Sequence, residues 1–235
     1  MTFLIFFSPE IILLTFLSIV IVLDLYLDVS KRFYSYVILQ SSLFLTLFFL
    51  IFYQSKLITS SYEIYDTSIF PTLFKIFLTS LLIIILHFSF SYLTTYKKYK
   101  SEYFMIMIFA LLGMMIMVSA NHLLILYLGI ELLSLSLYTI IAYNRESVFS
   151  AEAAIKYYIL GAMSSGFLLF GISLMYGLTG SLLYDDIATV ISQIDISPNS
   201  YSTSYIGLIF SLTFILISIA FKFGAAPFHM WIPDV

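Results

Sequence analysis

The chain has 235 residues, of which 62% are hydrophobic and only 10% are charged. An average soluble domain is about 45–50% apolar and about 25% charged, so water is not the main solvent of this protein. The formal net charge is -3, and ten lysine and arginine residues are spread along the whole chain. The sequence therefore offers no basic face for a phosphate backbone, and we expect no nucleic acid partner.

The residues that usually carry catalysis or bind metals are scarce. The absence of cysteine excludes disulfides, thiolate metal sites and cysteine nucleophiles. The three histidines, His87, His122 and His229, are far apart and lack the spacing of metal ligands. We therefore expect no metal site within the chain.

Seven apolar segments are each long enough to cross a bilayer, which takes about 20 residues. They cover residues 4–27, 33–53, 70–95, 103–120, 122–143, 152–178 and 204–226. Strands of a membrane barrel alternate in short runs, and these segments do not. The sequence predicts an all-α, polytopic protein with about seven transmembrane helices, which forms a single membrane domain over residues 1–235 and has lipids as neighbours.

The basic residues of the connections predict the orientation of the chain. The first segment, Phe3–Leu27, has no basic flank and no cleavage site, so we interpret it as a retained span. Alternate connections carry Lys31, Arg32, Lys97, Lys98, Lys100 and Arg145 on one side of the membrane and Lys56 on the other. The positive-inside rule then places the first set in the matrix or cytoplasm and the N-terminus outside.

Four ionisable residues lie within apolar segments: Lys75, Glu131, Lys156 and Lys222. Each costs about 2.5–3.5 kcal/mol at a helix centre, so such residues usually face a bundle interior and carry function. Lys75 closely follows Pro71, which marks a helix start, and we expect its long side chain to reach outward to the interface. Glu131 is too deep and too short to do so, which favours a functional role.

Lys156 and Lys222 each allow two interpretations. If the helix of Lys156 begins at Glu152, the lysine reaches the interface; if it begins near Ser147, Lys156 is deep enough to pair with Glu131. Lys222 precedes Gly224 and Pro227, which end or break the helix. A broken helix at membrane depth lines a wet cavity, whereas a helix that simply ends places Lys222 at the interface.

Histidines and small residues within the spans have simpler explanations. His87 lies beside Ser89, where a hydrogen-bonded helix contact is expected rather than a proton relay. His122 follows Asn121 and is expected to cap a helix. The run of small residues from Gly161 to Gly166, with Gly171 and Gly177 beyond it, predicts close helix packing.

Several stretches of the chain resemble a known family. They are Ser119-Ala-Asn-His-Leu-Leu, Leu128-Gly-Ile-Glu-Leu, Glu152-Ala-Ala-Ile-Lys-Tyr-Tyr, Ser165-Gly-Phe-Leu-Leu-Phe-Gly and Phe221–Val235. They resemble the antiporter-like, proton-pumping subunit 2 of NADH dehydrogenase, respiratory complex I. Residues 1–101, which hold three N-terminal helices, are similar to it only in hydropathy and in Phe7-Ser-Pro-Glu-Ile-Ile-Leu-Leu.

The resemblance implies roles for the buried charges. Residues 102–235 would form the first part of an antiporter-like repeat. Glu131 matches the glutamate of the family's fifth helix, Lys156 the lysine of its sixth, and Lys222 the lysine at the break in its seventh. These three residues would carry proton translocation, with His122 and His229 as candidate relay residues. Lys75 matches no residue of the motif.

The resemblance also implies a cellular setting. The chain would be a non-redox subunit of proton-translocating NADH:ubiquinone oxidoreductase, whose other subunits bind NADH, FMN, iron–sulfur clusters and ubiquinone. Its partners would be other membrane-arm subunits. Abundant Phe and Tyr with little Gly, Pro and Arg indicate an AT-rich, organelle-encoded gene. We therefore expect the mitochondrial inner membrane, with the N-terminus toward the intermembrane space.

One departure from the family leaves rival interpretations open. The family continues beyond the position of Val235, from which we predict a split gene and a second polypeptide that supplies the C-terminal half. A subunit of a multi-subunit sodium/proton antiporter would carry similar lysines. A structural membrane scaffold that has lost pumping would also keep the same fold.

Overall fold

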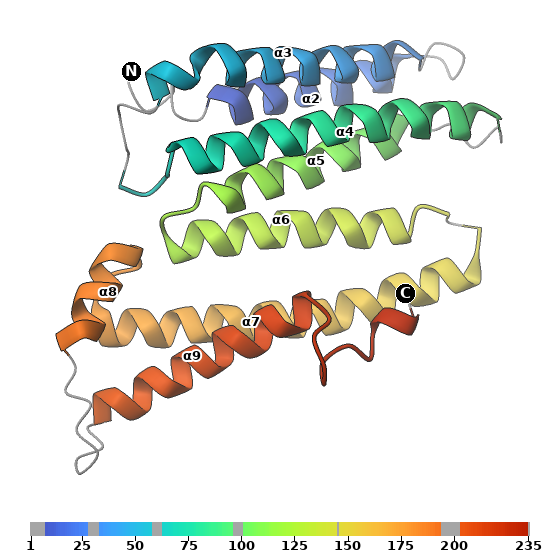
Figure 1. The fold of residues 1–235 in the computed structure, drawn as a ribbon. Coiled ribbons are helices and arrows are strands. Elements are labelled where there is room, and N and C mark those ends of the chain that lie inside the picture. Colours follow the sequence, from blue (N-terminus) through green and yellow to red (C-terminus); the bar gives the residue numbers. More distant parts are fainter. Residues whose placement is uncertain are drawn as a thin grey trace. The chain divides into compact units, whose positions relative to one another are not determined.

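The computed structural model describes residues 8–27, 33–57, 63–95, 101–144, 146–193 and 203–234. Seven of its helices are long and apolar enough to cross a membrane. They are α2 (Ser8–Tyr26), α3 (Phe33–Leu57), α4 (Ile69–Thr95), α5 (Ser101–Val118), α6 (Leu123–Ile141), α7 (Val148–Thr179) and α9 (Thr203–Lys222). Two short elements, α8 (Tyr184–Gln193) and η2 (Ile232–Asp234), accompany them (Figure 1). The prediction of an all-α protein with seven membrane helices is confirmed.

The chain divides into two compact units, Met1–Ala120 and Asn121–Val235. The sequence predicts a single membrane domain with two parts, residues 1–101 and 102–235, and the single domain stays a prediction. The division lies one helix later than expected because α5 packs against α2, α3 and α4. The two units are described separately below.

The first unit is a four-helix bundle with an apolar interior. Leucines of α2, α3 and α4 fill it, among them Leu13, Leu39 and Leu86, each fully buried. Near the end of α2, hydroxyl groups hold the half-buried Asp24: Ser35 Oγ donates to Asp24 Oδ1 at 2.8 Å and Ser101 Oγ donates to Oδ2 at 2.6 Å. Because Ser35 belongs to α3 and Ser101 to α5, one carboxylate joins three helices.

In the second unit, side chains cap the starts of α6 and α7. The His122 Nδ1 atom accepts a hydrogen bond from the Leu124 N–H at 3.2 Å, which confirms the predicted cap. Ser147 caps α7 through the Ser150 N–H, and α7 ends at Gly180 in the left-handed conformation, with φ of 72°. The helix of Lys156 therefore begins near Ser147, the second of the two starts considered above.

Small residues bring α7 and α9 into contact. The Ser211 hydroxyl donates to the Gly171 carbonyl oxygen at 2.8 Å, and Ser218 donates to the Ser164 carbonyl oxygen at 2.7 Å. A Cβ added at Gly161 would collide with the Tyr138 hydroxyl of α6. The predicted close packing is confirmed at Gly161 and Gly171, whereas Gly177 faces open space.

Helix α9 ends where the sequence predicts a break. Lys222 is its last helical residue, and Gly224 follows with φ of 62°, a conformation that favours glycine. The chain then turns back, and the Trp231 Nε1–H donates to the Phe221 carbonyl oxygen at 3.1 Å. The Trp231 ring stacks on Tyr157 of α7, with ring centroids 4.5 Å apart. The segment after the break is thereby folded against the end of α9 and against α7.

The basic residues that predict the orientation lie outside the described residues or have undescribed side chains. They are Lys31, Arg32, Lys56, Lys97, Lys98, Lys100 and Arg145. Val235 also lies outside the described residues. The orientation in the membrane and the split gene stay predictions.

Candidate functional site

Lys222 forms a polar contact with α6 at the point where α9 ends. Its Nζ donates to Ser134 Oγ at 2.8 Å and lies 3.5 Å from the Tyr138 hydroxyl oxygen. Ser134 and Tyr138 are both buried, and the Ser134 hydroxyl donates in turn to the Ile130 carbonyl oxygen. The ammonium group is thus held on α6 by neutral oxygen atoms.

Glu131 lies one turn before Ser134 on the same helix, with its side chain partly buried. Its Oε2 accepts a hydrogen bond of 2.6 Å from the Ser165 hydroxyl of α7. Lys222 contacts Ser134, three residues after Glu131 on the same helix. The structure therefore brings Glu131 and Lys222 to one region between α6, α7 and α9.

Lys156 does not join this region. Its Nζ forms an ion pair of 2.9 Å with Glu152, one turn earlier on α7, and 47% of the side chain is exposed. Glu131 contacts Ser165, which lies nine residues after Lys156 on α7. At 1.5 Å per residue, the two levels on α7 are about 14 Å apart. The expected Glu131–Lys156 pair is wrong because the N-terminal end of α7 projects past the C-terminal end of α6.

The two candidate relay histidines differ in position. His122 lies at the N-terminus of α6, where its side chain serves as the cap, and Glu131 follows more than two turns later on that helix. His229 lies in the turn after the break and is exposed. Neither a relay role for His122 nor one for His229 is tested by these positions.

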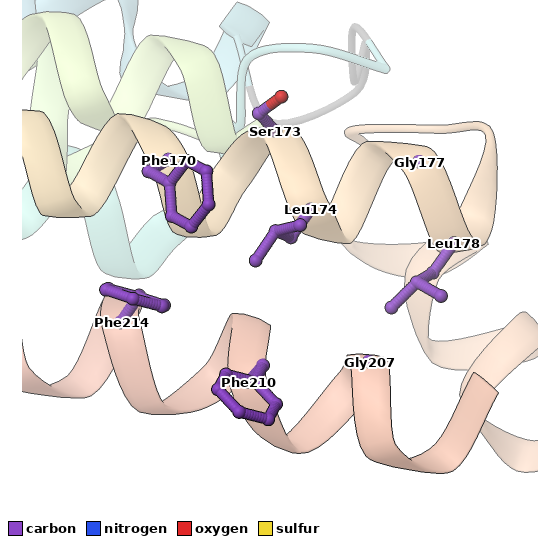
Figure 2. Close-up of a pocket in the computed structure, with 8 residues that line it drawn as sticks. All are labelled: Phe170, Ser173, Leu174, Gly177, Leu178, Gly207, Phe210 and Phe214. Atoms are coloured by element: carbon purple, nitrogen blue, oxygen red, sulfur yellow. The ribbon is translucent and has the colours of Figure 1, made fainter. Parts of the chain in front are cut away.

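An apolar groove runs along the contact between α7 and α9 (Figure 2). Its volume is about 600 Å³. The lining residues come from both helices: Phe170, Ser173, Leu174, Gly177, Leu178, Gly207, Phe210 and Phe214. None of these lining residues is charged, so the groove differs chemically from the region of Glu131 and Lys222.

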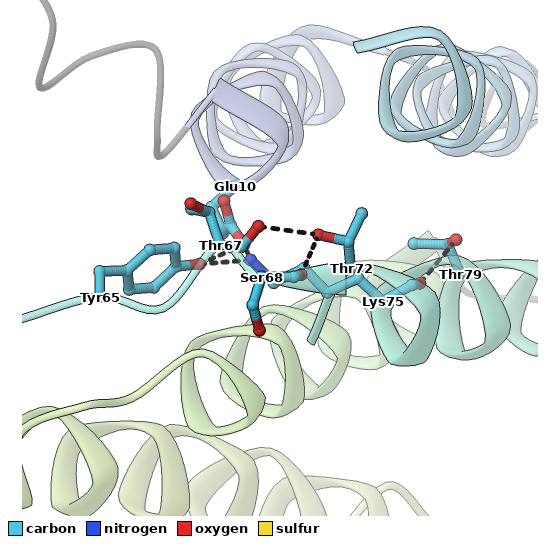
Figure 3. Close-up of polar contacts among 7 residues, drawn as sticks. All are labelled: Glu10, Tyr65, Thr67, Ser68, Thr72, Lys75 and Thr79. Carbon is cyan, nitrogen blue, oxygen red and sulfur yellow. Dashed lines mark hydrogen bonds and ion pairs between the residues drawn. The ribbon is translucent and has the colours of Figure 1, made fainter. Parts of the chain in front are cut away.

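A pair of opposite charges is buried in the first unit. Glu10 of α2 and Lys75 of α4 form an ion pair of 2.8 Å between Oε1 and Nζ, and their residues are 5% and 4% exposed (Figure 3). The expectation that Lys75 reaches outward to the interface is wrong. Tyr65 completes the cluster: its hydroxyl donates to Glu10 Oε1 at 2.6 Å and accepts from Lys75 Nζ at 2.7 Å.

Sequence reasoning missed Glu10, although a signal was present. Pro9 and Pro71 mark the starts of two spans that begin on the same side of the membrane. A helical side chain leans toward the N-terminus of its helix, so the long Lys75 side chain reaches back toward the level of Glu10. Two opposite charges near two such helix starts predict a pair, and the outward reach of a lone lysine is then the weaker interpretation.

Tyr65 is fully buried, and its hydroxyl contacts the ion pair. Burial, and then the Glu10 charge and hydrogen bond, raise the pKa of the Tyr65 hydroxyl well above its usual value, and the Ser119 side chain lowers it to a smaller extent. Tyr65 therefore stays protonated and remains a donor to Glu10 at any physiological pH.

Comparison with known proteins places these charges in a family context. The sequence profile of the family "NADH:quinone oxidoreductase/Mrp antiporter, TM" matches residues 120–235. NADH-quinone oxidoreductase subunit N of Ruthia magnifica is 44% identical over 97% of this chain, and that of Thiobacillus denitrificans is 42% identical over 97%. In each case the chain spans 46% of the relative, so it covers about half of their length.

Solved structures agree with the sequence comparison. A chain of respiratory complex I from Thermus thermophilus matches with a TM-score of 0.73 and 26% identity, over 97% of this chain and 46% of that one. A chain of the membrane-bound sulfane sulfur reductase, an archaeal respiratory membrane complex, shares the fold at a TM-score of 0.77 and 23% identity, over 96% and 46%. The relatives named by sequence are bacterial, so they give no support to a mitochondrial or organelle-encoded origin. By sequence, 97% of this chain is thus similar to about half of NADH-quinone oxidoreductase subunit N.

Proposed function

We propose that the chain is a membrane-arm subunit of a proton-translocating NADH:quinone oxidoreductase and contributes a buried glutamate and lysine to its proton path. Its role is not a redox one. Other membrane-arm subunits are its partners, and the NADH, FMN, iron–sulfur and ubiquinone sites belong to other subunits of the complex.

The observation that carries the proposal is the position of Lys222. The lysine stands at the last turn of α9, immediately before a glycine-dependent turn, and reaches Ser134 on another helix at 2.8 Å. A lysine that only interacted with the dipole at the end of its own helix would not need a contact with another helix. Neutral hydroxyl partners leave the ammonium free to lose its proton without breaking an ion pair.

Glu131 supplies the charge that controls this proton. Opposite charges about 4 Å apart interact by about 4 kcal/mol at an effective dielectric near 20. Moving one charge across 100 mV costs about 2.3 kcal/mol, which is smaller. Lys222 therefore holds its proton while the carboxylate is near, and it gives the proton up when Glu131 moves away or is neutralised.

Lys156 and the two histidines fill outer roles in the proposed path. Lys156, exposed beside Glu152, exchanges protons with the aqueous side that the charge rule assigns to the matrix or cytoplasm. His122 and His229 are relay candidates at the ends of α6 and of the turn after α9. A mitochondrial inner membrane, with the N-terminus toward the intermembrane space, remains a prediction without support from the bacterial relatives.

The decisive experiment separates charge from proton exchange at Lys222. Lys222→Met removes both, while Lys222→Arg keeps the positive charge but cannot release a proton at any physiological pH. We expect both variants to assemble and oxidise NADH while losing the proton translocation that this subunit contributes. The measurement is the ratio of protons moved to NADH oxidised, in vesicles that hold the complete complex.

Each possible outcome has a distinct meaning. If Lys222→Arg retains the full ratio while Lys222→Met loses it, Lys222 acts as a fixed charge and the carrier role is overturned. If both keep the full ratio, Lys222 is outside the proton path. Full activity in the two variants would favour the scaffold interpretation.

A subunit of a sodium/proton antiporter is the second candidate. The family whose profile matches residues 120–235 includes such antiporters by name. Purification of the intact assembly distinguishes the two functions. Recovery of the chain with an NADH-oxidising arm supports the first, and recovery with sodium-dependent proton exchange but no such arm supports the second.

A further inference from the structure

The Tyr138 side chain of α6 lies beside Lys222 without being its closest hydrogen-bond partner. Lys222 Nζ is 3.5 Å from the Tyr138 hydroxyl oxygen and 6.0 Å from the centre of its ring, but 2.8 Å from Ser134 Oγ. An N–H···O hydrogen bond usually spans about 2.7–3.2 Å, so the Ser134 contact is the stronger one. Because a lysine side chain is flexible, a small displacement of its nitrogen exchanges one hydroxyl for the other.

The position of the Tyr138 hydroxyl is fixed by its packing against α7. A Cβ added at Gly161 would overlap the hydroxyl oxygen and would lie 2.7 Å from Cζ of the ring. The Tyr157 ring meets the Tyr138 ring edge-on, with centroids 4.7 Å apart and an angle of 85° between the planes. Tyr138 is only 6% exposed. The hydroxyl is therefore held at one place, against the backbone of α7 and beside Lys222.

The segment after the break in α9 closes around the same place. The Trp231 ring stacks on Tyr157, which in turn packs on Tyr138. The Trp231 Nε1–H donates to the carbonyl oxygen of Phe221, the residue before Lys222. These contacts lead from the tyrosine back to the end of α9, and they keep Lys222 within reach of the Tyr138 hydroxyl.

The two hydroxyl groups differ in the proton that each can offer. An ammonium group only donates hydrogen bonds, whereas a neutral amine has a lone pair that needs a donor. The single proton of the Ser134 hydroxyl goes to the Ile130 carbonyl oxygen at 2.8 Å. The Tyr138 proton, in contrast, goes to no carbonyl or carboxylate oxygen in the part of the chain that the structure describes. Ser134 therefore suits the charged form of Lys222, and Tyr138 suits the neutral form.

We propose that Tyr138 is the hydrogen-bond donor that stabilises Lys222 after the lysine has released its proton, an inference that rests on the carrier role proposed above. While Lys222 is charged, its ammonium group donates to Ser134 Oγ. When the proton leaves to water, the neutral amine turns to Tyr138, whose O–H donates to the nitrogen lone pair. Tyr138 neither gains nor loses a proton in this exchange.

Other titratable groups near Lys222 belong to three elements. They are Glu131 and Tyr138 of α6, Tyr157 and Tyr158 of α7, and His229 of the turn after α9. A nearby carboxylate favours the charged form of a lysine, which is the role of Glu131. Of these groups, Tyr138 is the one with an oxygen 3.5 Å from Lys222 Nζ.

The pH dependence of proton translocation tests this proposal in vesicles that hold the complete complex. At high pH Lys222 fails to take up a new proton, so the ratio of protons moved to NADH oxidised falls, with a midpoint that reports the proton affinity of Lys222. Tyr138→Phe keeps the ring but removes the donor to the neutral amine. The midpoint should therefore rise by about half a pH unit, which is equivalent to one net hydrogen bond.

Two further variants make the test specific. Ser134→Ala removes the acceptor for the charged form of Lys222, so the midpoint should fall. Tyr157→Phe is the matched control, because it removes a hydroxyl from the neighbouring buried ring and keeps the packing on Tyr138. The midpoint of this control should equal that of the unaltered complex.

Opposite shifts in Tyr138→Phe and Ser134→Ala would support the proposal, because a loss of packing does not move the midpoint in two directions. A midpoint that stays or falls in Tyr138→Phe would overturn it. If Tyr138→Phe does not assemble, 3-fluorotyrosine in place of Tyr138 decides the matter. This residue has nearly the same size and is a stronger donor, so the midpoint should fall, and an unmoved midpoint would contradict the proposal.

Lys222→Met separates this inference from the pumping role. If that variant loses translocation while the Tyr138→Phe midpoint stays unchanged, Lys222 remains the carrier and the donor role of Tyr138 alone fails. If Lys222→Met keeps the full ratio of protons to NADH, the carrier role itself fails.

Discussion

At the scale of single residues, the most unusual feature is an ion pair inside an apolar bundle. Glu10 and Lys75 give up the hydration of two charges, and each keeps its charge stable only through the other and through Tyr65. Removing one partner of such a pair is more damaging than removing both, because the remaining charge is left buried and unpaired.

Lys75→Met should therefore destabilise the protein strongly, by about 3–5 kcal/mol. Glu10→Gln combined with Lys75→Met removes both charges and should recover more than half of that loss. The measurement is the midpoint of thermal inactivation of the assembled complex, with the level of the subunit as a second readout. Asp24→Asn combined with Lys75→Met is the control and should show additive losses; additive losses in the Glu10 combination would contradict the pairing.

Two adjacent serines of α7 have different roles: one holds a residue of the candidate site, and the other packs α7 against α9. Ser165 donates to Glu131 Oε2 at 2.6 Å, whereas Ser164 contacts Ser218 of α9. Ser165→Ala should slow proton translocation because Glu131 loses its anchor on α7, with little change in thermal stability. Ser164→Ala should lower the thermal stability with little change in proton translocation. The translocation rate and the thermal midpoint are measured for both variants. Equal effects of the two variants on translocation would argue against a specific role of Ser165.

At the scale of helices, glycines decide how closely α7 and α9 approach. A Cβ at Gly171 would lie 2.8 Å from Ile215 Cγ1 and 3.0 Å from the Ser211 carbonyl oxygen, which is backbone and cannot give way. A Cβ at Gly177 would meet nothing within 4 Å. The two positions lie on the same helix and differ in what they face.

Gly171→Ala should separate the two helices and weaken the hydrogen bond from Ser211 to the Gly171 carbonyl. We expect a loss of about 1–3 kcal/mol, the usual cost of overpacking. Gly177→Ala should be neutral or slightly stabilising, since alanine favours the helix by about 1 kcal/mol. Thermal midpoints of the two variants check this prediction, and a larger loss at Gly177 would contradict it.

At the scale of the whole molecule, the sequence could predict which segments become helices but not how they pair. Apolar length alone predicts the seven spans, and Gly224 with Pro227 predicts the end of α9. The Glu131 and Lys156 pair was wrong because relative depth depends on how far α7 projects past α6, which no local pattern encodes. The Glu10 and Lys75 pair was missed because a charge close to a helix start usually reaches water.

The orientation of the chain in the membrane can be tested directly, since the natural sequence has no cysteine. Glu63 and Glu146 are both exposed, and an odd number of predicted spans separates them. A thiol reagent that cannot cross membranes should label Glu63→Cys from the outer side and Glu146→Cys from the matrix or cytoplasmic side. Labelling of both from the same side would contradict the predicted count of spans.

The length of α7 has a consequence for the lipids around the protein. Its 32 residues extend about 48 Å, against a hydrocarbon core of about 30 Å. The contact of Glu131 with Ser165 sets Lys156 opposite Ile140, at the end of α6, whose 19 residues match the thickness of that core. We therefore expect Lys156 at the level of the phosphate headgroups, where anionic lipids would compete with Glu152 for its ammonium group and the charge of the bilayer surface would become part of its environment.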